Sequence, residues 1–310
     1  MTDLKFKPVE AEDMKLLAPY FGLRPNKTCD SVPLDSFIWR KYYHVQYAIH
    51  ENKALLWLMR EDGIMHSAMP LCKEEDLKKY FDMTVEYFNQ VLHIPLKIYL
   101  ADEEAVEYLH LKESEDFVVT EQVDLKDYLY DGEAMRKLSG KKLHKKKNHL
   151  NAFLREYEGR YEYRTLCCSD RDDVWEFLDR WWENKVEAAE FGTQLDYEVN
   201  GIHDILKNCS QLCVRMAGVY IDGKLEAFTI GSYNEFEKMA VIHIEKANPE
   251  INGLYQFINR EFLVRAFPEE MMLVNREDDV GMEGLRRAMM SYNPIDFARK
   301  YSIEQKDFKG

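Results

Sequence analysis

The sequence lacks the signatures of several large classes of protein. No stretch approaches the ~20 consecutive apolar residues of a membrane-spanning helix. Residues 1–13 carry acids and no apolar run, which is not the pattern of a signal peptide. The chain has no Walker loop, no Ser-x-Gly nucleophile elbow and no cluster of side chains at metal-ligand spacing. We therefore expect no integral membrane segment and no metal.

Cysteine is scarce, and its spacing suits neither metal binding nor catalysis. Cys209 and Cys213 lie one helical turn apart, but no histidine or second pair follows at ligand spacing. Cys167 and Cys168 are expected on opposite faces of a strand, with no histidine at a readable distance. This pattern favours reduced thiols that serve packing, in a cytoplasmic protein.

The composition is that of a globular chain with real cores. Hydrophobic residues make up 46% and aromatic residues 13% of the sequence, and 310 residues favour two domains of ordinary size. The formal net charge is -14. Such a surface repels nucleic acid and anionic lipid as a whole, so binding to either requires a local basic patch.

The predicted elements run through one order twice. The order is strand, helix, helix, three strands, helix, strand, helix, strand; its first copy ends near residue 125 and its second runs from residue 161 to residue 303. Asp222-Gly223 marks a hairpin in the second copy. We predict an α/β (α+β) fold with a mixed sheet flanked by helices in each of two tandem domains, residues 1–130 and 159–310, joined by a basic helix over residues 131–158.

Three segments carry a resemblance to a known family: residues 138–151, 243–247 and 274–288. With the order of elements, they resemble the GNAT-type N-acyltransferase fold in the doubled form of the Fem-type aminoacyl-tRNA-dependent transferases. The chain is most similar to uncharacterised bacterial proteins grouped with the C-terminal domain of phosphatidylglycerol lysyltransferases. The resemblance implies two GNAT-like domains and transfer of an acyl or aminoacyl group, with the active site mainly in the second domain.

One departure from the fold's usual pattern concerns coenzyme A. Acetyl-CoA-binding members carry an Arg/Gln-x-x-Gly-x-Gly/Ala loop whose backbone N–H groups hold the pyrophosphate at a helix N-terminus. Here residues 248–256 contain one glycine, no arginine and an acid, and residues 71–75 contain no glycine and two carboxylates. Acyl-CoA is therefore disfavoured. Because Fem-type and lysyltransferase members also lack a strict loop, aminoacyl-tRNA is the favoured donor.

A strongly basic segment separates the two halves. No Asp or Glu occurs from Ala134 to Arg155. Like charges one helical turn apart cost a few tenths of a kcal/mol, so a helix that begins near Ser139 and carries them is suited to tRNA, a nucleotide phosphate or an anionic head group. The alternative is a solvated connector whose lysines pair with acids on the two domains. The candidate polyanion- or donor-binding residues are Lys141, Lys142, Lys145, Lys146 and Asn148.

A second candidate site follows a predicted buried strand over residues 271–274. Ligands collect at the carboxyl ends of strands in open sheets, and Asn275 and Arg276 stand there as candidate substrate-binding residues. Glu277 or Asp278 could hold an amine or act as a base. For the acids Asp278 and Asp279 the alternative is capping of the following helix, which requires no ligand. Capping does not explain Asn275 or Arg276.

The third candidate is Glu245, on a predicted strand. It alternates with Ile242 and Ile244, which places it on the opposite face from them. In the fold that the chain resembles, this strand runs beside the acceptor and the acyl donor. The resemblance therefore makes Glu245 the candidate general base and Tyr255 a candidate proton donor. The alternative is an exposed strand residue paired with a nearby lysine, Lys246 or Lys238.

The leading hypothesis is an enzyme that moves an acyl or aminoacyl group from an activated donor to the amine or hydroxyl of a small acceptor. Its expected partner is tRNA or another polyanion. A rival from another class is a catalytically silent GNAT-like module that binds RNA or another polyanion. A third hypothesis, modification of lipids at an anionic membrane surface, has the net charge against it.

Overall fold

The computed structural model describes residues 4–187, 193–306 and 308. The chain divides into two compact units. Unit 1 comprises Met1–Asp127, Asp278–Gly281 and Phe297–Gly310, and unit 2 comprises Tyr128–Glu277 and Met282–Asp296. Each unit is therefore assembled from segments that are distant in the sequence.

Unit 1 contains a sheet of order β1-β2-β3-β4 and a sheet of order β5-β14-β6. A parallel bridge between Ser67 and Ile98 joins the end of the first sheet to β5. The strands are β1 (Lys7–Pro8), β2 (Gln46–His50), β3 (Ala54–Glu61), β4 (Ile64–His66), β5 (Lys97–Asp102), β6 (Phe117–Glu121) and β14 (Lys300–Gln305). The α-helices are α1 (Met14–Leu17), α2 (Pro33–Ile38), α3 (Leu77–Glu86) and α4 (Glu103–Tyr108).

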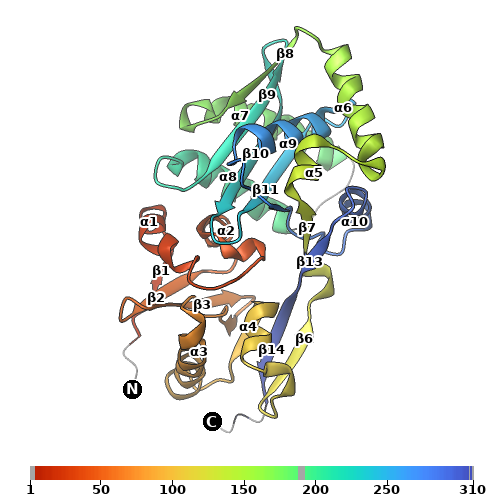
Figure 1. Cartoon of the computed structure of the whole chain (residues 1–310). Helices are drawn as coiled ribbons and strands as arrows, with labels where there is room; N and C mark the ends of the chain where they lie inside the picture. The colour runs from red at the N-terminus through yellow and green to blue at the C-terminus, as the bar shows by residue number, and fades with distance from the viewer. Residues whose placement is uncertain (1–3, 188–192, 307, 309–310) are drawn as a thin grey trace. The chain divides into compact units, whose positions relative to one another are not determined.

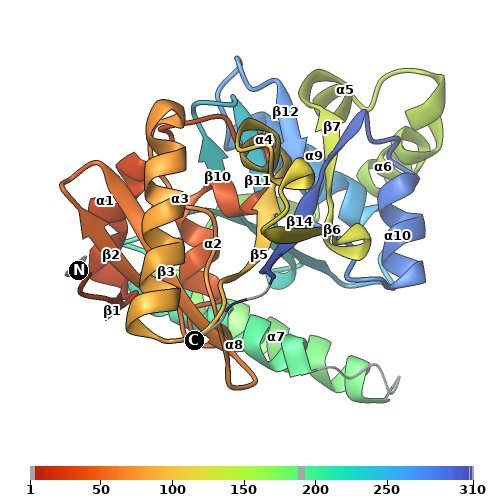
Figure 2. The ribbon, with the colours of Figure 1, turned by 90° about the horizontal axis from the view of Figure 1, so that it is seen from below.

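Unit 2 is built on a sheet of order β13-β7-β12-β11-β10-β9-β8. Figure 1 shows α5 and α9 over one face of this sheet, and Figure 2 shows α7 and α8 side by side on the other. The strands are β7 (Asp127–Asp131), β8 (Tyr161–Thr165), β9 (Arg215–Ile221), β10 (Lys224–Asn234), β11 (Met239–Ala247), β12 (Leu273–Asn275) and β13 (Asp296–Ala298). The α-helices are α5 (Gly132–Lys137), α6 (His144–Glu156), α7 (Arg171–Glu187), α8 (Thr193–Asn208), α9 (Leu254–Arg265) and α10 (Glu283–Met290).

The strands of unit 1, taken across the bridge between its two sheets, follow the same order as those of the sheet in unit 2. Each unit receives one strand from the other half of the sequence. In unit 1, β14 pairs with β5 and with β6. In unit 2, β7 lies between β12 and β13. The strands that end the two halves of the sequence, β7 and β14, are therefore exchanged, and β7 lies beyond residue 125, where the first predicted copy ends. The predicted fold class, a mixed α/β fold of GNAT type, is confirmed, whereas the contiguous halves expected from the sequence differ from the observed units in these exchanged segments.

The basic connector is not one continuous helix from near Ser139. The short helix α5 ends at Lys137, and Leu138 and Gly140 both have left-handed backbone angles, φ 44° and 89°. A 3-10 turn then leads into α6 at His144. Left-handed residues cannot continue a right-handed helix, so the basic residues are distributed over α5, the 3-10 turn and α6.

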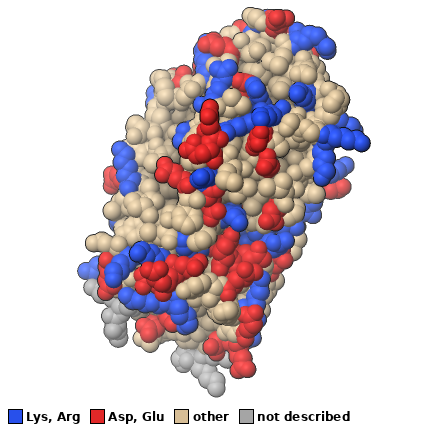
Figure 3. Space-filling view, viewed as in Figure 1, with Lys and Arg blue, Asp and Glu red and all other residues tan. Residues whose placement is uncertain are grey.

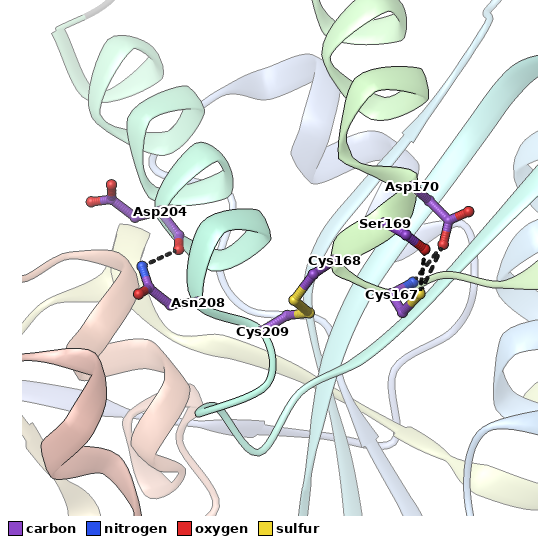
Figure 4. Close-up of a disulfide and its surroundings, with 7 residues drawn as sticks. All are labelled: Cys167, Cys168, Ser169, Asp170, Asp204, Asn208 and Cys209. Atoms are coloured by element: carbon purple, nitrogen blue, oxygen red, sulfur yellow. Dashed lines mark hydrogen bonds between the residues drawn. A yellow bond between two sulfur atoms is a disulfide. The ribbon is translucent and has the colours of Figure 1, made fainter.

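A disulfide links Cys168, just before α7, to Cys209, just after α8 (Figure 4). The expectation of reduced thiols is therefore wrong for this pair. Cys168 begins the 3-10 turn that precedes α7 and Cys167 directly precedes that turn, so neither is on a strand; Cys213 lies beyond α8. The pairing joins residues 41 positions apart, which local spacing does not indicate.

In the described part of the chain, no helix combines the length and the apolar character that a membrane span requires.

Candidate active site

The site lies where two parallel strands of unit 2 diverge. The pairing of β11 with β12 ends at Val241 and Asn275, while β11 continues to Ala247. Polar side chains from β11, from the segment after β12 and from α9 meet beyond that point. This is the carboxyl end of both strands, where open α/β sheets place their ligands.

Register within the sheet is altered by a β-bulge at His243. Ile230 of β10 pairs with Ile244, and the next residue, Gly231, pairs with Ile242, so His243 is an extra residue between them. Consecutive residues of β10 face opposite sides, and their partners on β11 face with them. The prediction that Ile242 and Ile244 share one face is therefore wrong, because the bulge interrupts the alternation.

Glu245 and Arg276 form a buried ion pair. Arg276 Nη2 donates to Glu245 Oε1 at 2.9 Å, and the two side chains are 15% and 6% exposed. Asn259 of α9 donates to the other carboxylate oxygen at 2.7 Å. Burial by itself lowers the pKa of Arg276, but Glu245 outweighs it and the pKa is raised. Glu245 is thus not an exposed strand residue, and its cation is Arg276, not either of the lysines considered above.

Aromatic residues surround this ion pair. The guanidinium of Arg276 lies 4.9 Å from the ring centroid of Tyr292, and the hydroxyl of Tyr292 accepts a hydrogen bond from Gln256. Tyr255, at the start of α9, lies close enough to Glu245 and Arg276 to interact with their charges, and burial raises its pKa. The raised pKa keeps the Tyr255 hydroxyl protonated at pH 7, and so available as a proton donor.

A second hydrogen-bonded chain starts at the bulge. His243 Nδ1 lies 2.7 Å from Glu277 Oε1, and His243 Nε2 lies 3.0 Å from Ser232 Oγ on β10. Burial lowers the pKa of His243 to about 3, although the adjacent carboxylate alone favours the protonated ring. The imidazole is therefore neutral at pH 7. Sequence inspection selected Glu277 but not His243 or Ser232, because the bulge that joins them leaves no local signal.

Asn275 and Asp278 have local structural roles. The buried side chain of Asn275 accepts a hydrogen bond from the backbone N–H of Glu277 at 2.7 Å. Asp278 accepts from the N–H of Val280 at 3.0 Å and lies 3.6 Å from Lys300, and burial raises its pKa. The helix-capping interpretation of the acids is wrong, since α10 begins only at Glu283, after Met282.

The basic residues of the connector separate into two groups. Arg136 of α5 donates to backbone carbonyls at the end of α9 and in the loop after it, so its charge serves packing. Lys146 lies 4.1 Å from the ring of Tyr292, and burial together with Arg276 lowers its pKa. Lys141, Lys142, Lys145 and Asn148 are exposed on the 3-10 turn and α6, along the edge where Figure 3 shows blue side chains.

Unit 1 holds a buried polar cluster that the sequence did not reveal. Lys300 Nζ on β14 is 2.7 Å from Asp127 Oδ1 and 3.1 Å from Cys29 Sγ, and its side chain is 1% exposed. Burial lowers the pKa of Lys300, but Asp127 and the neighbouring acids outweigh it and raise the pKa well above its usual range. A lysine among apolar residues in a predicted strand was the available signal. The partners of Lys300 come from distant segments, so the cluster itself was not predictable.

The sheet order, the parallel β11–β12 pair that diverges and the exchanged strands are those of a GNAT-like fold in doubled form. The family described as phosphatidylglycerol lysyltransferase, C-terminal, matches residues 30–304. The chain belongs to this family, as the resemblance predicted.

Individual relatives agree with this assignment. A conserved protein of unknown function from Bacteroides thetaiotaomicron superposes with a TM-score of 0.87 at 27% identity, over 98% of this chain and 100% of that one. L-PGS from Bacillus licheniformis superposes with a TM-score of 0.70 at 13% identity, over 97% and 94% of the two chains. The uncharacterized protein MYCGA3080 of Mycoplasmoides gallisepticum is 21% identical over 287 residues, covering 87% of this chain and 90% of that protein.

Proposed function

We propose that the protein transfers an acyl or aminoacyl group from an activated ester to an amine or hydroxyl, in the opening between β11 and β12. One observation carries the proposal: the buried Glu245–Arg276 pair lies at the carboxyl ends of two diverging parallel strands. Family and fold are those of acyl- and aminoacyl-transferases. Attack on an activated ester requires positioning, a base and stabilisation of the oxyanion, all of which side chains and backbone donors can supply.

The roles of the residues follow from their contacts. Glu245 is the proposed base for the incoming amine or hydroxyl, and Tyr255 the proposed donor of a proton to the leaving oxygen. Arg276 is the proposed anchor for an anionic group of the donor. Such a group would compete with Glu245 for the guanidinium and so release the carboxylate to accept a proton. In the absence of substrate, the ion pair holds both side chains in place.

The start of α9 supports an aminoacyl ester over acyl-CoA as the donor. In a CoA-binding loop, the helix N-terminus is open to a pyrophosphate. Here α6 packs against it: a Cβ added to Gly253 would lie 2.1 Å from the backbone oxygen of His149. His149 Nδ1 also lies 2.8 Å from Asn252 Oδ1. The close packing of the basic helix on the start of α9 therefore disfavours a pyrophosphate there.

The direct test is transfer by the purified protein with charged tRNAs, and separately with acyl-CoAs, plus candidate acceptors. The family name makes lysyl-tRNA and phosphatidylglycerol the first pair to test. We expect Glu245→Gln to lower the rate by about 10²–10⁴-fold, the range of general-base catalysis. Glu250→Gln, at an exposed glutamate in the loop after β11, is the matched control and should leave the rate unchanged. Absence of transfer with every pair would contradict the proposal.

The alternative of a catalytically silent polyanion-binding module rests on the lysines of α6 and its preceding turn. Among the residues that the structure describes, no ion pair involves Lys141, Lys142 or Lys145. The interpretation that these lysines pair with acids therefore loses its support. Their uncompensated charge favours binding of a phosphate backbone.

Charge reversal tests this second function. We expect Lys→Glu changes at Lys141, Lys142 and Lys145 together to abolish a tRNA gel shift at moderate salt. The slope of log affinity against log salt should fall by roughly 2–3, because each lost phosphate contact removes about 0.7–0.9. The control variant reverses Lys15 and Lys53, which are exposed in unit 1, and should bind like the parent. An unchanged slope in the triple variant would exclude this surface; tRNA binding that depends on it, without turnover, would favour the silent module.

A further inference from the structure

We propose that Ser232 is a nucleophile and that transfer proceeds through an acyl–Ser232 intermediate, with His243 as its base and Glu277 as the residue that orients the base. This deepens the proposed function and rests on it for the class of donor, an activated acyl ester. It replaces the direct attack described above with two steps, in which His243 makes the proton transfers that direct attack assigns to Glu245 and Tyr255.

The geometry is that of a nucleophile, a base and an orienting acid. Ser232 Oγ lies 3.0 Å from His243 Nε2, and the other ring nitrogen lies 2.7 Å from the carboxylate of Glu277. These distances are within the range in which an activated serine is recognised, and the arrangement is defined by geometry and not by order in the chain. The three residues come from β10, β11 and the segment after β12.

The backbone departs from regular geometry at two of these three residues. His243 is the extra residue of the β-bulge on β11. Glu277 has a left-handed backbone angle, φ 61°, which is uncommon for a residue with a side chain, and its N–H is held by Asn275. Bulges next to active sites re-aim side chains. The bulge re-aims the imidazole of His243, and the left-handed conformation of Glu277 accompanies the contact of its carboxylate with that ring.

The protonation state follows from the contacts. An ionised Glu277 has only acceptors, so the Nδ1 of His243 carries the hydrogen and donates it. The Nε2 is then the acceptor for the Ser232 hydroxyl. Burial keeps the ring neutral, as the low pKa of His243 indicates. This is the tautomer that a general base for serine requires.

The chemistry balances without a cofactor. Ser232 Oγ attacks the carbonyl carbon of the donor ester and gives its proton to His243 Nε2. The bond from the carbonyl carbon to the donor's oxygen breaks, and that oxygen leaves with the proton from His243. The acceptor's amine or hydroxyl then attacks the acyl–Ser232 carbonyl and gives its proton to His243, which returns it to Ser232 Oγ as the bond to serine breaks.

The test uses a small fluorophosphonate probe, since Ser232 is 3% exposed. Its P–F bond breaks as the bond from phosphorus to Ser232 Oγ forms, so labelling requires no acyl donor. We expect one adduct on the peptide that contains Ser232, by mass spectrometry of the full chain after digestion. Ser232→Ala should remove it. His243→Asn should slow labelling by about 10²-fold or more, and Glu277→Gln by a smaller factor.

Ser67 is the matched internal control. It is also buried, and its hydroxyl donates to the backbone oxygens of Trp57 and Ala68, both at 2.9 Å, and not to a histidine. We expect no adduct on Ser67. Circular dichroism confirms that each variant is folded, and the conservative Glu277→Gln change keeps the test informative where His243→Asn is not folded.

The outcomes separate this inference from the proposed function. No adduct on Ser232, or equal labelling in the parent and the folded Glu277→Gln and His243→Asn variants, overturns the inference. Transfer that persists in Ser232→Ala also overturns it and leaves direct transfer standing. An adduct with the expected dependence supports it, even if no donor in the transfer assay gives turnover.

Discussion

Replacement of Arg276 by methionine is expected to lower the free energy of unfolding by about 3–5 kcal/mol, the usual cost of removing one partner from a buried ion pair. Glu245 would keep only the hydrogen bond from Asn259 while its side chain stays 6% exposed. A buried carboxylate without a cation loses its hydration and receives nothing equivalent in exchange. Urea denaturation with a fixed m-value measures the loss.

A double-mutant cycle distinguishes this cause from lost packing. Glu245→Gln combined with Arg276→Met removes both charges. We therefore expect the double variant to be more stable than the Arg276→Met single variant. Arg287→Met is the control, because Arg287 pairs with Glu283 on the exposed surface of α10, with side chains 74% and 82% exposed. Its effect should stay within about 0.5 kcal/mol. Equal stabilities of the single and double variants would show that the charge of Glu245 is not what Arg276 compensates.

Replacement of Gly253 by alanine is expected to cost about 2–5 kcal/mol. Gly253 has φ +83°, which costs a residue with a Cβ about 1–2 kcal/mol. Its Cβ would also lie 2.1 Å from the backbone oxygen of His149. Relief of that overlap requires α6 to move away from α9, at the further cost typical of overpacking, about 1–3 kcal/mol.

Gly223→Ala is the matched control for this change. Gly223 has the same φ, +83°, but an added Cβ would meet nothing within 4 Å. We therefore expect Gly223→Ala to lower the free energy of unfolding by only the cost of the left-handed backbone conformation, about 1–2 kcal/mol. Thermal and urea unfolding of the two variants, measured side by side, isolate the cost of the contact with α6. Equal losses would contradict the close packing of α6 on the start of α9.

The residues of the site illustrate where prediction from sequence succeeds. The segment after β12 was selected because polar residues follow an apolar strand, and Arg276 and Glu277 indeed contact β11. The same local rule could not separate them from Asn275 and Asp278, whose side chains bond to the nearby backbone. Which of several adjacent polar residues reaches a partner depends on backbone angles that the residue types do not determine.

The order and type of most elements and the sign of the charge along the chain follow from the amino-acid sequence. These depend on hydrophobic periodicity, turn residues and composition, which are local. The bulge at His243, the exchange of β7 and β14, the pairing of Cys168 with Cys209 and the cation that Glu245 contacts are evident only in the folded chain. Each of these joins residues far apart in the chain, through register and packing that no local pattern records. The basic connector illustrates the difference. Its charge was evident from the sequence, whereas its interruption at Leu138 and Gly140 and the packing of α6 on the start of α9 are known only from the structure.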